Sequence, residues 1–215
     1  MIIELYGHPF SAYTWKAQIA IHAADLDYKF HMLDPGHPDN LAFVAANGGP
    51  FGKFPVLDDN GTVVFEATSI IEHLAAHHQK ASGLLPSGRA EKLRQMDRVF
   101  DNYVMNVMQD VVNEQLRNPD APDTARQDEA REKLRRVYAW LEPRADLLCR
   151  GPLTLVECAA APSLFYADWV ERIGDDCPDL KALRSRLLRL PEVIRCVDAA
   201  YPYRHLFPLG DPHRD

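Results

Sequence analysis

The first third of the chain changes its hydrophobic period several times over short distances. Residues 2–6 form an apolar run that predicts a short buried strand. Residues 13–24 show a helical period, and residues 28–32 alternate apolar and polar side chains as a strand does. This strand–helix–strand order predicts a parallel pair of strands joined by a right-handed crossover.

The helix over 13–24 has one apolar face. Trp15, Ile19 and Ala23 define that face by their spacing, and Lys16 and Gln18 fall off it. We therefore expect these two polar side chains to lie away from the core.

The next segment predicts a short helix, a hairpin and a third helix. The short helix covers 40–46, and the Asn60-Gly61 pair between two apolar runs favours a type I′ hairpin turn, which needs positive φ at both central residues. Residues 66–74 carry the third helical pattern. The order βαβ, α, ββα is the thioredoxin-like layout, with a four-stranded mixed sheet.

Beyond the polar, breaker-rich residues 80–89 the strand period disappears and only helical patterns remain. Two capping boxes, Thr124 with Gln127 and Thr154 with Glu157, mark helix starts. The predicted helices cover 90–117, 124–148 with Pro143 inside, 154–173 with Pro162 inside, 180–190 and 191–200. We predict an α/β plus all-α protein: a thioredoxin-like domain over 1–79, a linker over 80–89 and an all-helical domain over 90–215.

Charge and composition narrow the classes of partner. The 215 residues carry a formal net charge of −7, and the pI near 5.7 argues against a nucleic-acid or anionic membrane surface. None of the four cysteines forms a C-x-x-C pair, which is typical of buried, reduced thiols. We see no leader segment and no apolar run of about 18 residues, so we expect a cytoplasmic protein without a membrane span.

Pro55 is unusual because it stands at the mouth of the hairpin. It can simply start the strand, at the loss of one ladder donor. Alternatively it takes the cis form and turns the backbone so that the N–H and C=O of Phe54 face outward, free to pair with an extended peptide.

Three motifs in this order resemble the cytosolic glutathione S-transferase family over almost the whole chain. Residues 52–57 (GKFPVL) are similar to the family's G-K-V-P-x-L, residues 66–70 (EATSI) to its E-S-x-A-I, and 154–157 (TLVE) to its S/T-x-x-D capping box. The resemblance implies a cis Pro55, pairing of the Phe54 backbone with the cysteinyl part of glutathione, and a homodimer. It implies the fold more strongly than the activity.

The resemblance also assigns partners to the charged groups of glutathione. Glu66 is the candidate for its ammonium, and the amides of Ala67 and Thr68 at a helix start suit its γ-glutamyl carboxylate. The family has a serine where this chain has Ala67, which leaves Thr68 or Ser69 as substitute donors. The glycyl carboxylate needs a cation, for which Lys53 is the first choice. His37 is the second choice, although an ordinary loop histidine explains it better.

The thiol of glutathione must be ionised to react, and a hydroxyl after the first strand serves this purpose in the family. Ser11, Tyr13 and Thr14 are the candidates. We prefer Ser11, because residues 11–15 (SAYTW) resemble the S-S-C-S-W of zeta-like members, whose first serine is catalytic. Ser11 can also act as the N-cap of the helix, and the two roles are compatible.

A second substrate is expected between the two domains. Its candidate lining residues are Phe10, Tyr13, Met105, Met108 and Tyr166. Each can equally be a core residue. We interpret Asp97, Asp101 and Asp110 on the long helix as a solvated face.

The predicted function is attack by the thiolate of bound glutathione on a small hydrophobic electrophile. Glutathione is then a co-substrate, and we expect no metal. Peroxide reduction or isomerisation by the same thiolate is a variant of this function. The competing hypothesis is a non-catalytic glutathione- or ligand-binding protein of the same fold, which Ala67 favours.

Overall fold

A four-stranded mixed sheet forms the first part of the molecule, in the order β2-β1-β3-β4. Strand β1 (Ile3–Gly7) runs parallel to β2 (Tyr28–Met32), and β3 (Val56–Asp59) pairs antiparallel with both β1 and β4 (Thr62–Phe65). This confirms the predicted thioredoxin-like layout. The computed structural model describes residues 2–146, 148 and 150–212.

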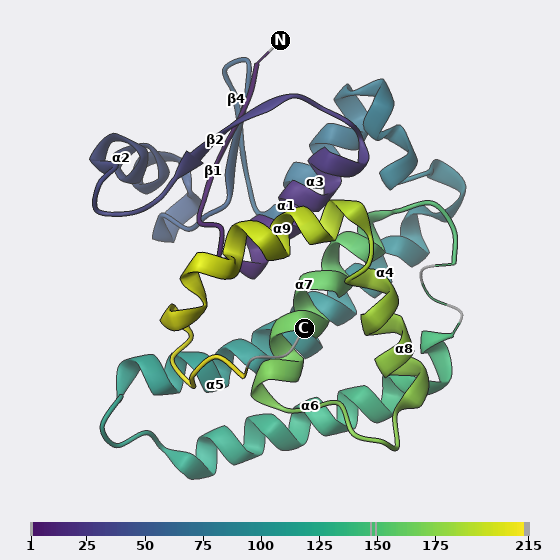
Figure 1. Cartoon of the computed structure of the whole chain (residues 1–215). Coiled ribbons are helices and arrows are strands. Elements are labelled where there is room, and N and C mark those ends of the chain that lie inside the picture. Colours follow the sequence, from purple (N-terminus) through teal and green to yellow (C-terminus); the bar gives the residue numbers. More distant parts are fainter. Residues whose placement is uncertain (1, 147, 149, 213–215) are drawn as a thin grey trace.

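Three helices accompany the sheet (Figure 1). Helix α1 (Ala12–Ala23) and helix α3 (Ala67–His77) pack against each other between the sheet and the rest of the molecule. Helix α2 (Pro38–Asn47) lies at the other side of the sheet and is mostly exposed. The shared position of α1 and α3 brings their N-termini to the boundary between the two parts.

The hairpin between β3 and β4 has the predicted turn. The φ angles of Asn60 and Gly61 are 53° and 89°, so both central residues lie in the left-handed region. The Phe54-Pro55 peptide bond at the mouth of this hairpin is cis, which confirms the expectation drawn from the motif.

Helix α1 is buried on all sides, which corrects the expectation for its polar residues. Lys16 is 1% exposed and Gln18 is 7% exposed, as deeply placed as much of the apolar face. The reason is that α1 also contacts α7 and α9, so the side facing away from the sheet is covered as well. A charged residue so deeply buried needs ionic partners, and Lys16 has them in the second part of the chain.

Helices alone make up the second part. Helix α4 (Ala90–Val99) continues through a π-helical segment (Phe100–Met105) into helix α5 (Asn106–Arg117). The predicted helix over 90–117 is therefore present, with a wider turn at its middle. Helix α7 (Leu155–Val170) is buried at every position and forms the centre of this part. Of the remaining helices, α8 (Pro178–Leu187) packs on α7, α6 (Thr124–Ala145) packs on α5 and α8, and α9 (Pro191–Ala200) packs on α1.

Several predicted ends shift by a few residues. Helix α6 ends at Ala145 rather than 148, with Pro143 in its last turn, and α7 ends at Val170 rather than 173. Helix α8 begins and ends earlier than predicted, because Pro178 suits a first helical position.

Within the described part of the chain, no helix is long and apolar enough to cross a bilayer.

One of the two predicted capping boxes is wrong. The Asp123 side chain caps α6 by accepting from the Arg126 N–H, and Gln127 turns instead toward Val111 and Gln115. Asp competes well as an N-cap residue, and it stands one position earlier than the predicted threonine.

The second capping box, at the start of α7, is confirmed. The Glu157 carboxylate accepts from the Thr154 N–H at 2.7 Å, and the Thr154 hydroxyl accepts from the Val156 N–H at 3.3 Å. These bonds satisfy amides at a buried helix end, where water cannot replace them.

Thr154→Ala should therefore destabilise the protein by about 1–2 kcal/mol, because buried amides of α7 lose their acceptor. Urea unfolding followed by circular dichroism measures the change. The matched control is Thr124→Ala, which removes an exposed threonine that caps nothing and should leave the midpoint unchanged. Equal effects of the two substitutions would contradict this assignment of the caps.

Candidate functional site

A polar cleft of about 520 Å³ lies where the α/β part meets the α4–α5 helix. The α/β part contributes the segment before β3 and the start of α3, and the facing wall comes from the π segment and α5. The lining residues are Tyr13, Gly48, Lys53, Phe54, Pro55, Phe65, Glu66, Ala67, Asp101, Asn102, Asn106, Gln109, Asp110 and Asn113. The structure thus brings together five of the six predicted glutathione-contact residues.

The backbone of Phe54 is available at the floor of this cleft. Neither its N–H nor its C=O bonds to another backbone group in the described part of the chain. Regular pairing in β3 begins only at Val56, opposite Phe65. An extended ligand can therefore add its own main chain alongside Phe54, as a strand adds to a sheet edge.

Opposite charges flank that free backbone. Lys53 is exposed, lines the cleft, and forms no ion pair with a carboxylate among the described residues. Glu66 lines the same cleft after β4, and Asp101 and Asp110 add negative charge from the facing wall. The cleft therefore suits an extended molecule with an anionic group near Lys53 and a cationic group near Glu66.

The start of α3 provides backbone donors. Glu66 precedes the helix with a φ of 69°, and its C=O already accepts from the Ile70 N–H. The first amides of a helix have no partner within it, and the helix dipole favours an anion beside them. Ala67 is 4% exposed and lines the cleft at this position.

Thr68 does not replace the missing serine, which corrects one of the two predicted substitutes. Its hydroxyl is buried and accepts from the Lys16 ammonium at 2.8 Å while donating to Asp97 at 3.0 Å. Ser69 is exposed and is not among the residues that line the cleft. An anion placed at this helix start would therefore have backbone amides as its donors.

A second, apolar cavity of about 270 Å³ adjoins the polar cleft. Tyr13, Phe54 and Gln109 line both spaces, so the two spaces adjoin at these residues. The remaining lining residues are Phe10, Ser11, Ala12, Met108, Val112, Leu116, Tyr166, Leu206, Phe207 and Pro208. With Tyr13 included, four of the five predicted second-substrate residues line this cavity.

Met105 is the fifth, and its prediction is wrong. It is 1% exposed and belongs to the main hydrophobic core. The π segment ends at Met105 and changes which side chains of the long helix face the cavity. Met108 alone of the predicted methionine pair lines it.

Ser11 stands at the N-terminus of α1 on the wall of the apolar cavity. Its Oγ accepts from the Thr14 N–H at 3.3 Å, as an N-cap residue does. No described acceptor takes the Ser11 hydroxyl proton, so that proton is free to point at a ligand. The hydroxyl and the helix dipole together favour a negative charge at this point.

The loop that carries Ser11 is fixed from both sides. The Trp15 ring nitrogen donates to the Pro9 carbonyl at 2.6 Å, and the Tyr166 hydroxyl donates to the Phe10 carbonyl at 3.0 Å. Tyr166 comes from α7, so the second part of the molecule positions the first helix start. Such fixed geometry is what a catalytic hydroxyl requires.

The two alternative hydroxyls are differently placed. Tyr13 faces both cavities, but its hydroxyl donates to Asn106 Oδ1 at 2.9 Å. Burial, with the nearby Asp101 and Glu66 charges, raises the pKa of Tyr13 far above its ordinary value, so it stays protonated. Thr14 is fully buried against Gly7, where its side chain reaches neither cavity, and that candidate is wrong.

His37 lies away from the cleft. It precedes α2 and its Nδ1 pairs with Asp34 at 2.7 Å in an exposed loop. It is among the lining residues of neither cavity. This position agrees with the alternative that His37 is an ordinary loop histidine.

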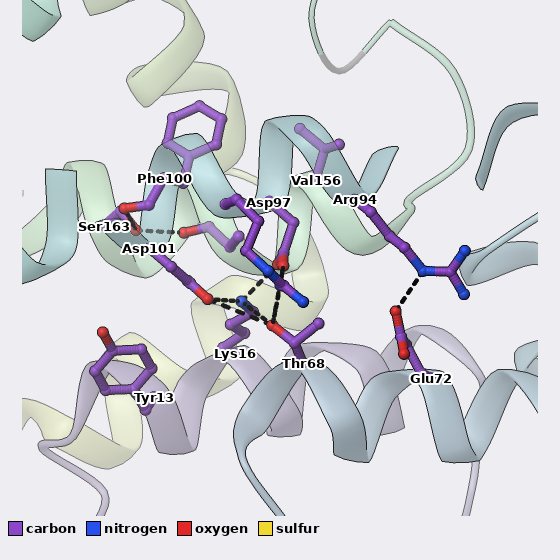
Figure 2. A network of polar contacts seen from close by, with 12 residues as sticks. Tyr13, Lys16, Thr68, Glu72, Arg94, Asp97, Phe100, Asp101, Val156 and Ser163 are labelled. Carbon is purple, nitrogen blue, oxygen red and sulfur yellow. Dashed lines mark hydrogen bonds and ion pairs between the residues drawn. The ribbon is translucent and has the colours of Figure 1, made fainter. Parts of the chain in front are cut away.

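Beneath the cleft a buried ionic network joins the two parts of the protein (Figure 2). The Lys16 ammonium lies 2.5 Å from Asp97 and 2.6 Å from Asp101, and Arg98 also pairs with Asp97. This corrects the interpretation of these aspartates as a solvated face, since Asp97 is fully buried. The sequence does carry a signal for this network. Lys16 is a lysine within an apolar helical segment, and Asp97 and Asp101 are two acids four residues apart on a later helix.

Asp101 connects this network to the cleft. It lies in the π segment, one of its oxygens binds Lys16, and it also lines the polar cavity. Burial raises the pKa of Asp101 above its ordinary value, although Lys16 opposes the shift. The polar amides Asn102, Asn106 and Gln109 follow on the same wall, and sequence patterns alone did not single them out.

The comparisons with known proteins agree with this geometry. A family model described as the N-terminal domain of glutathione S-transferases matches residues 5–82. Glutathione S-transferase F6 of Arabidopsis thaliana is 28% identical over 192 residues, which cover 84% of this chain and 91% of that protein.

Solved structures match over both parts of the chain. Glutathione S-transferase III in its apo form gives a TM-score of 0.75 at 25% identity, covering 93% of this chain and 97% of the other. Glutathione transferase F7 from Populus trichocarpa gives a TM-score of 0.77 at 21% identity, covering 92% of this chain and 98% of the other. At this identity the likeness shows a shared fold.

The fold and the two-part cleft define a protein with a thioredoxin-like first domain and a helical second domain that share one site. By these matches, residues 5–82 belong to the family of glutathione S-transferase N-terminal domains, and the chain as a whole is similar to glutathione S-transferases.

Lys16→Met should destabilise the protein by about 3–5 kcal/mol, because it leaves Asp101 without its buried cation and Asp97 paired with the half-exposed Arg98 alone. Chemical denaturation at pH 7 measures the loss. The control is Lys80→Met, which breaks an exposed pair with Asp25 and should change stability little.

The loss of unfolding free energy caused by Lys16→Met, its stability deficit, should become smaller as the pH falls from 7 toward 5. Burial raises the folded pKa of Asp101 and Lys16 opposes that rise, so the folded pKa of Asp101 is higher still in Lys16→Met. Acid therefore favours the folded state of the variant more than that of the unmodified protein. A deficit that grows on acidification would contradict the buried ionic network.

Proposed function

We propose that this protein is a glutathione transferase that joins the sulfur of glutathione to a small hydrophobic electrophile. The observation that carries the proposal is the free Phe54 backbone between the Lys53 cation and the Glu66 anion. Glutathione is a short peptide with a free amino group, two carboxylates and a thiol. Its main chain and charges match the order of groups along this cleft.

The peptide lies in one direction only. Its ammonium approaches Glu66 and its γ-glutamyl carboxylate accepts from the amides at the start of α3. The cysteinyl main chain pairs with Phe54, and the glycyl carboxylate reaches Lys53. The reverse direction places a carboxylate beside Glu66 and leaves Lys53 without an anion.

This placement directs the thiol toward Ser11, on the wall of the apolar cavity that adjoins the polar cleft. A free thiol has a pKa of about 8.5, so only a small fraction is thiolate at pH 7. The Ser11 hydroxyl donates a hydrogen bond to the sulfur anion, and the N-terminus of α1 adds a favourable dipole. Both effects lower the pKa of the bound thiol.

The reaction then needs no group on the protein to carry a covalent intermediate. The thiol proton leaves to solvent, the sulfur lone pair forms a C–S bond, and a leaving group such as halide departs with its electron pair. The second substrate occupies the apolar cavity, where Phe10, Met108 and Tyr166 provide aromatic and polarisable contacts.

The direct test of the function combines binding with turnover. We expect the purified protein to be retained on immobilised glutathione and to conjugate an aryl halide such as a chlorodinitrobenzene. Retention without turnover on aryl halide, peroxide or disulfide substrates would favour the non-catalytic binding protein. Failure of retention as well would remove both hypotheses.

Ser11→Ala should raise the pKa of the bound glutathione thiol and reduce turnover at least about tenfold, which corresponds to about 1.4 kcal/mol. Ultraviolet absorbance of the thiolate, titrated with pH, measures the first effect. Tyr13→Phe is the matched hydroxyl control, because Tyr13 already donates to Asn106, and it should leave the thiol pKa nearly unchanged. The opposite pattern would transfer the role to Tyr13.

Ala67→Ser should tighten glutathione binding roughly fivefold, about 1 kcal/mol, by adding a hydroxyl donor at the α3 N-terminus. Isothermal titration calorimetry measures the affinity. Ser69→Ala is the control, because Ser69 lines neither cavity and should leave the affinity unchanged. A tighter complex would show that the γ-glutamyl carboxylate lies beside position 67, and an unchanged one would place it elsewhere.

The resemblance also implies a homodimer, and we include this in the proposal. Exposed aromatic side chains support it: Tyr103 is 58% exposed and Trp140 is 43% exposed along one groove between the long helix and α6. Light scattering of the purified protein should give twice the chain mass of 24.3 kDa, and a monomer mass would contradict it.

A further inference from the structure

A histidine–aspartate cluster lies at the end of the β3–β4 hairpin, outside both halves of the cleft. Asp59 ends β3, His73 lies within α3, and His78 follows α3. The Nε2 atom of His73 is 2.9 Å and that of His78 is 2.7 Å from the same Asp59 oxygen, Oδ2. One potential ligand atom from each of these residues lies within 4.8 Å of the others.

The cluster is sheltered and its central carboxylate is held in place. Asp59 is 8% exposed and the side chains of His78 and His73 are 8% and 12% exposed. The other Asp59 oxygen, Oδ1, accepts from the Asn60 side chain at 2.7 Å. This bond to Oδ1 holds the carboxylate with Oδ2 directed at the two imidazoles, in the way that outer hydrogen bonds orient the ligands of a metal ion.

We propose that Asp59, His73 and His78 bind one divalent transition-metal ion of the zinc class. Two imidazoles and one carboxylate are a donor set that Zn²⁺ accepts, with three protein ligands and one further position. Metal–ligand bonds of about 2.0–2.2 Å place tetrahedral ligand atoms about 3.4 Å apart. The present separations of 2.7 and 2.9 Å must therefore widen by roughly half an ångström, which side-chain rotation supplies.

His77 borders the cluster on its exposed side. It stands one helical turn after His73, and their ring centroids are 4.5 Å apart. Histidines at i and i+4 share a helix face, a spacing that metal sites use. The fourth coordination position of the ion is thus taken either by water or by His77. The site of Asp59, His73 and His78 is the same in both cases.

The ion would clamp the end of the hairpin to the C-terminal end of α3. None of Asp59, His73 and His78 lines either cavity, so the ion has no part in thiol chemistry. Its effect is on stability, because a ligand that binds only the folded state raises the unfolding temperature. This proposal departs from the expectation of no metal, and the sequence signal for it is the run His73-x₃-His77-His78.

The test uses tag-free protein that has been treated with a chelator and then titrated with Zn²⁺ alone. We expect one Zn²⁺ per chain by calorimetry and a rise in melting temperature on adding the ion. Co²⁺ as a probe should give the intense visible absorption of a tetrahedral site. Glutathione binding and turnover are measured separately, so failure of this proposal leaves the proposed function untouched.

Three variants locate the site. His73→Gln and His78→Gln should each weaken Zn²⁺ binding at least about tenfold and abolish most of the thermal shift, since each removes a ligand. Asp59→Asn keeps a hydrogen-bonding group for the histidines and removes the charge. His37→Ala is the matched control, because it removes a histidine from the exposed His37–Asp34 pair.

The outcomes separate the two readings of the cluster. A thermal shift that is present in the unmodified protein and in His37→Ala, and lost in the three variants, supports the site. Equal responses in all proteins, or no response to Zn²⁺ in the unmodified chain, would show that the cluster is only a hydrogen-bonded His–Asp–His group. Circular dichroism at low temperature checks that each variant is folded.

Discussion

A single buried ammonium, that of Lys16, constrains the arrangement of this protein. It extends from α1 to Thr68 in α3 and to Asp97 and Asp101 on the long helix, so three elements from two parts of the chain meet at one charge. A buried charge without a partner costs several kcal/mol of folding free energy. The folded state is therefore favoured only when these three elements take this relative position. The same three elements carry the site: Ser11 begins α1, Ala67 begins α3, and Asp101 lines the cleft.

The site that results is divided by chemistry. Its polar half offers a free main chain and ordered charges, which suit a peptide held in one direction, and its apolar half offers aromatic and thioether contacts. Ser11 stands on the wall of the apolar half, where a sulfur at the middle of the peptide would meet a hydrophobic partner. This division suits the proposed function, in which the polar half holds glutathione and the apolar half holds a hydrophobic electrophile.

Local signals in the sequence were sufficient for much of the fold and for the floor of the cleft. The hairpin turn at Asn60-Gly61, the capping box at Thr154 and the Phe54-Pro55 segment depend on nearby residues, and the structure shows each as predicted.

Long-range packing decided the features that the sequence did not predict. The burial of Lys16 depends on contacts with α7 and α9, and the inward turn of Met105 depends on the π segment, neither of which a period in the sequence reveals. Domain limits and the roles of the site residues remain predictions.

The most direct test of the account is a crystal structure of the protein with glutathione bound. We predict that the Phe54 N–H and C=O pair with the cysteinyl main chain, that the ammonium lies beside Glu66, and that the sulfur is within hydrogen-bond distance of the Ser11 hydroxyl. Glutathione bound in the reverse direction, or with its sulfur remote from Ser11, would contradict the account.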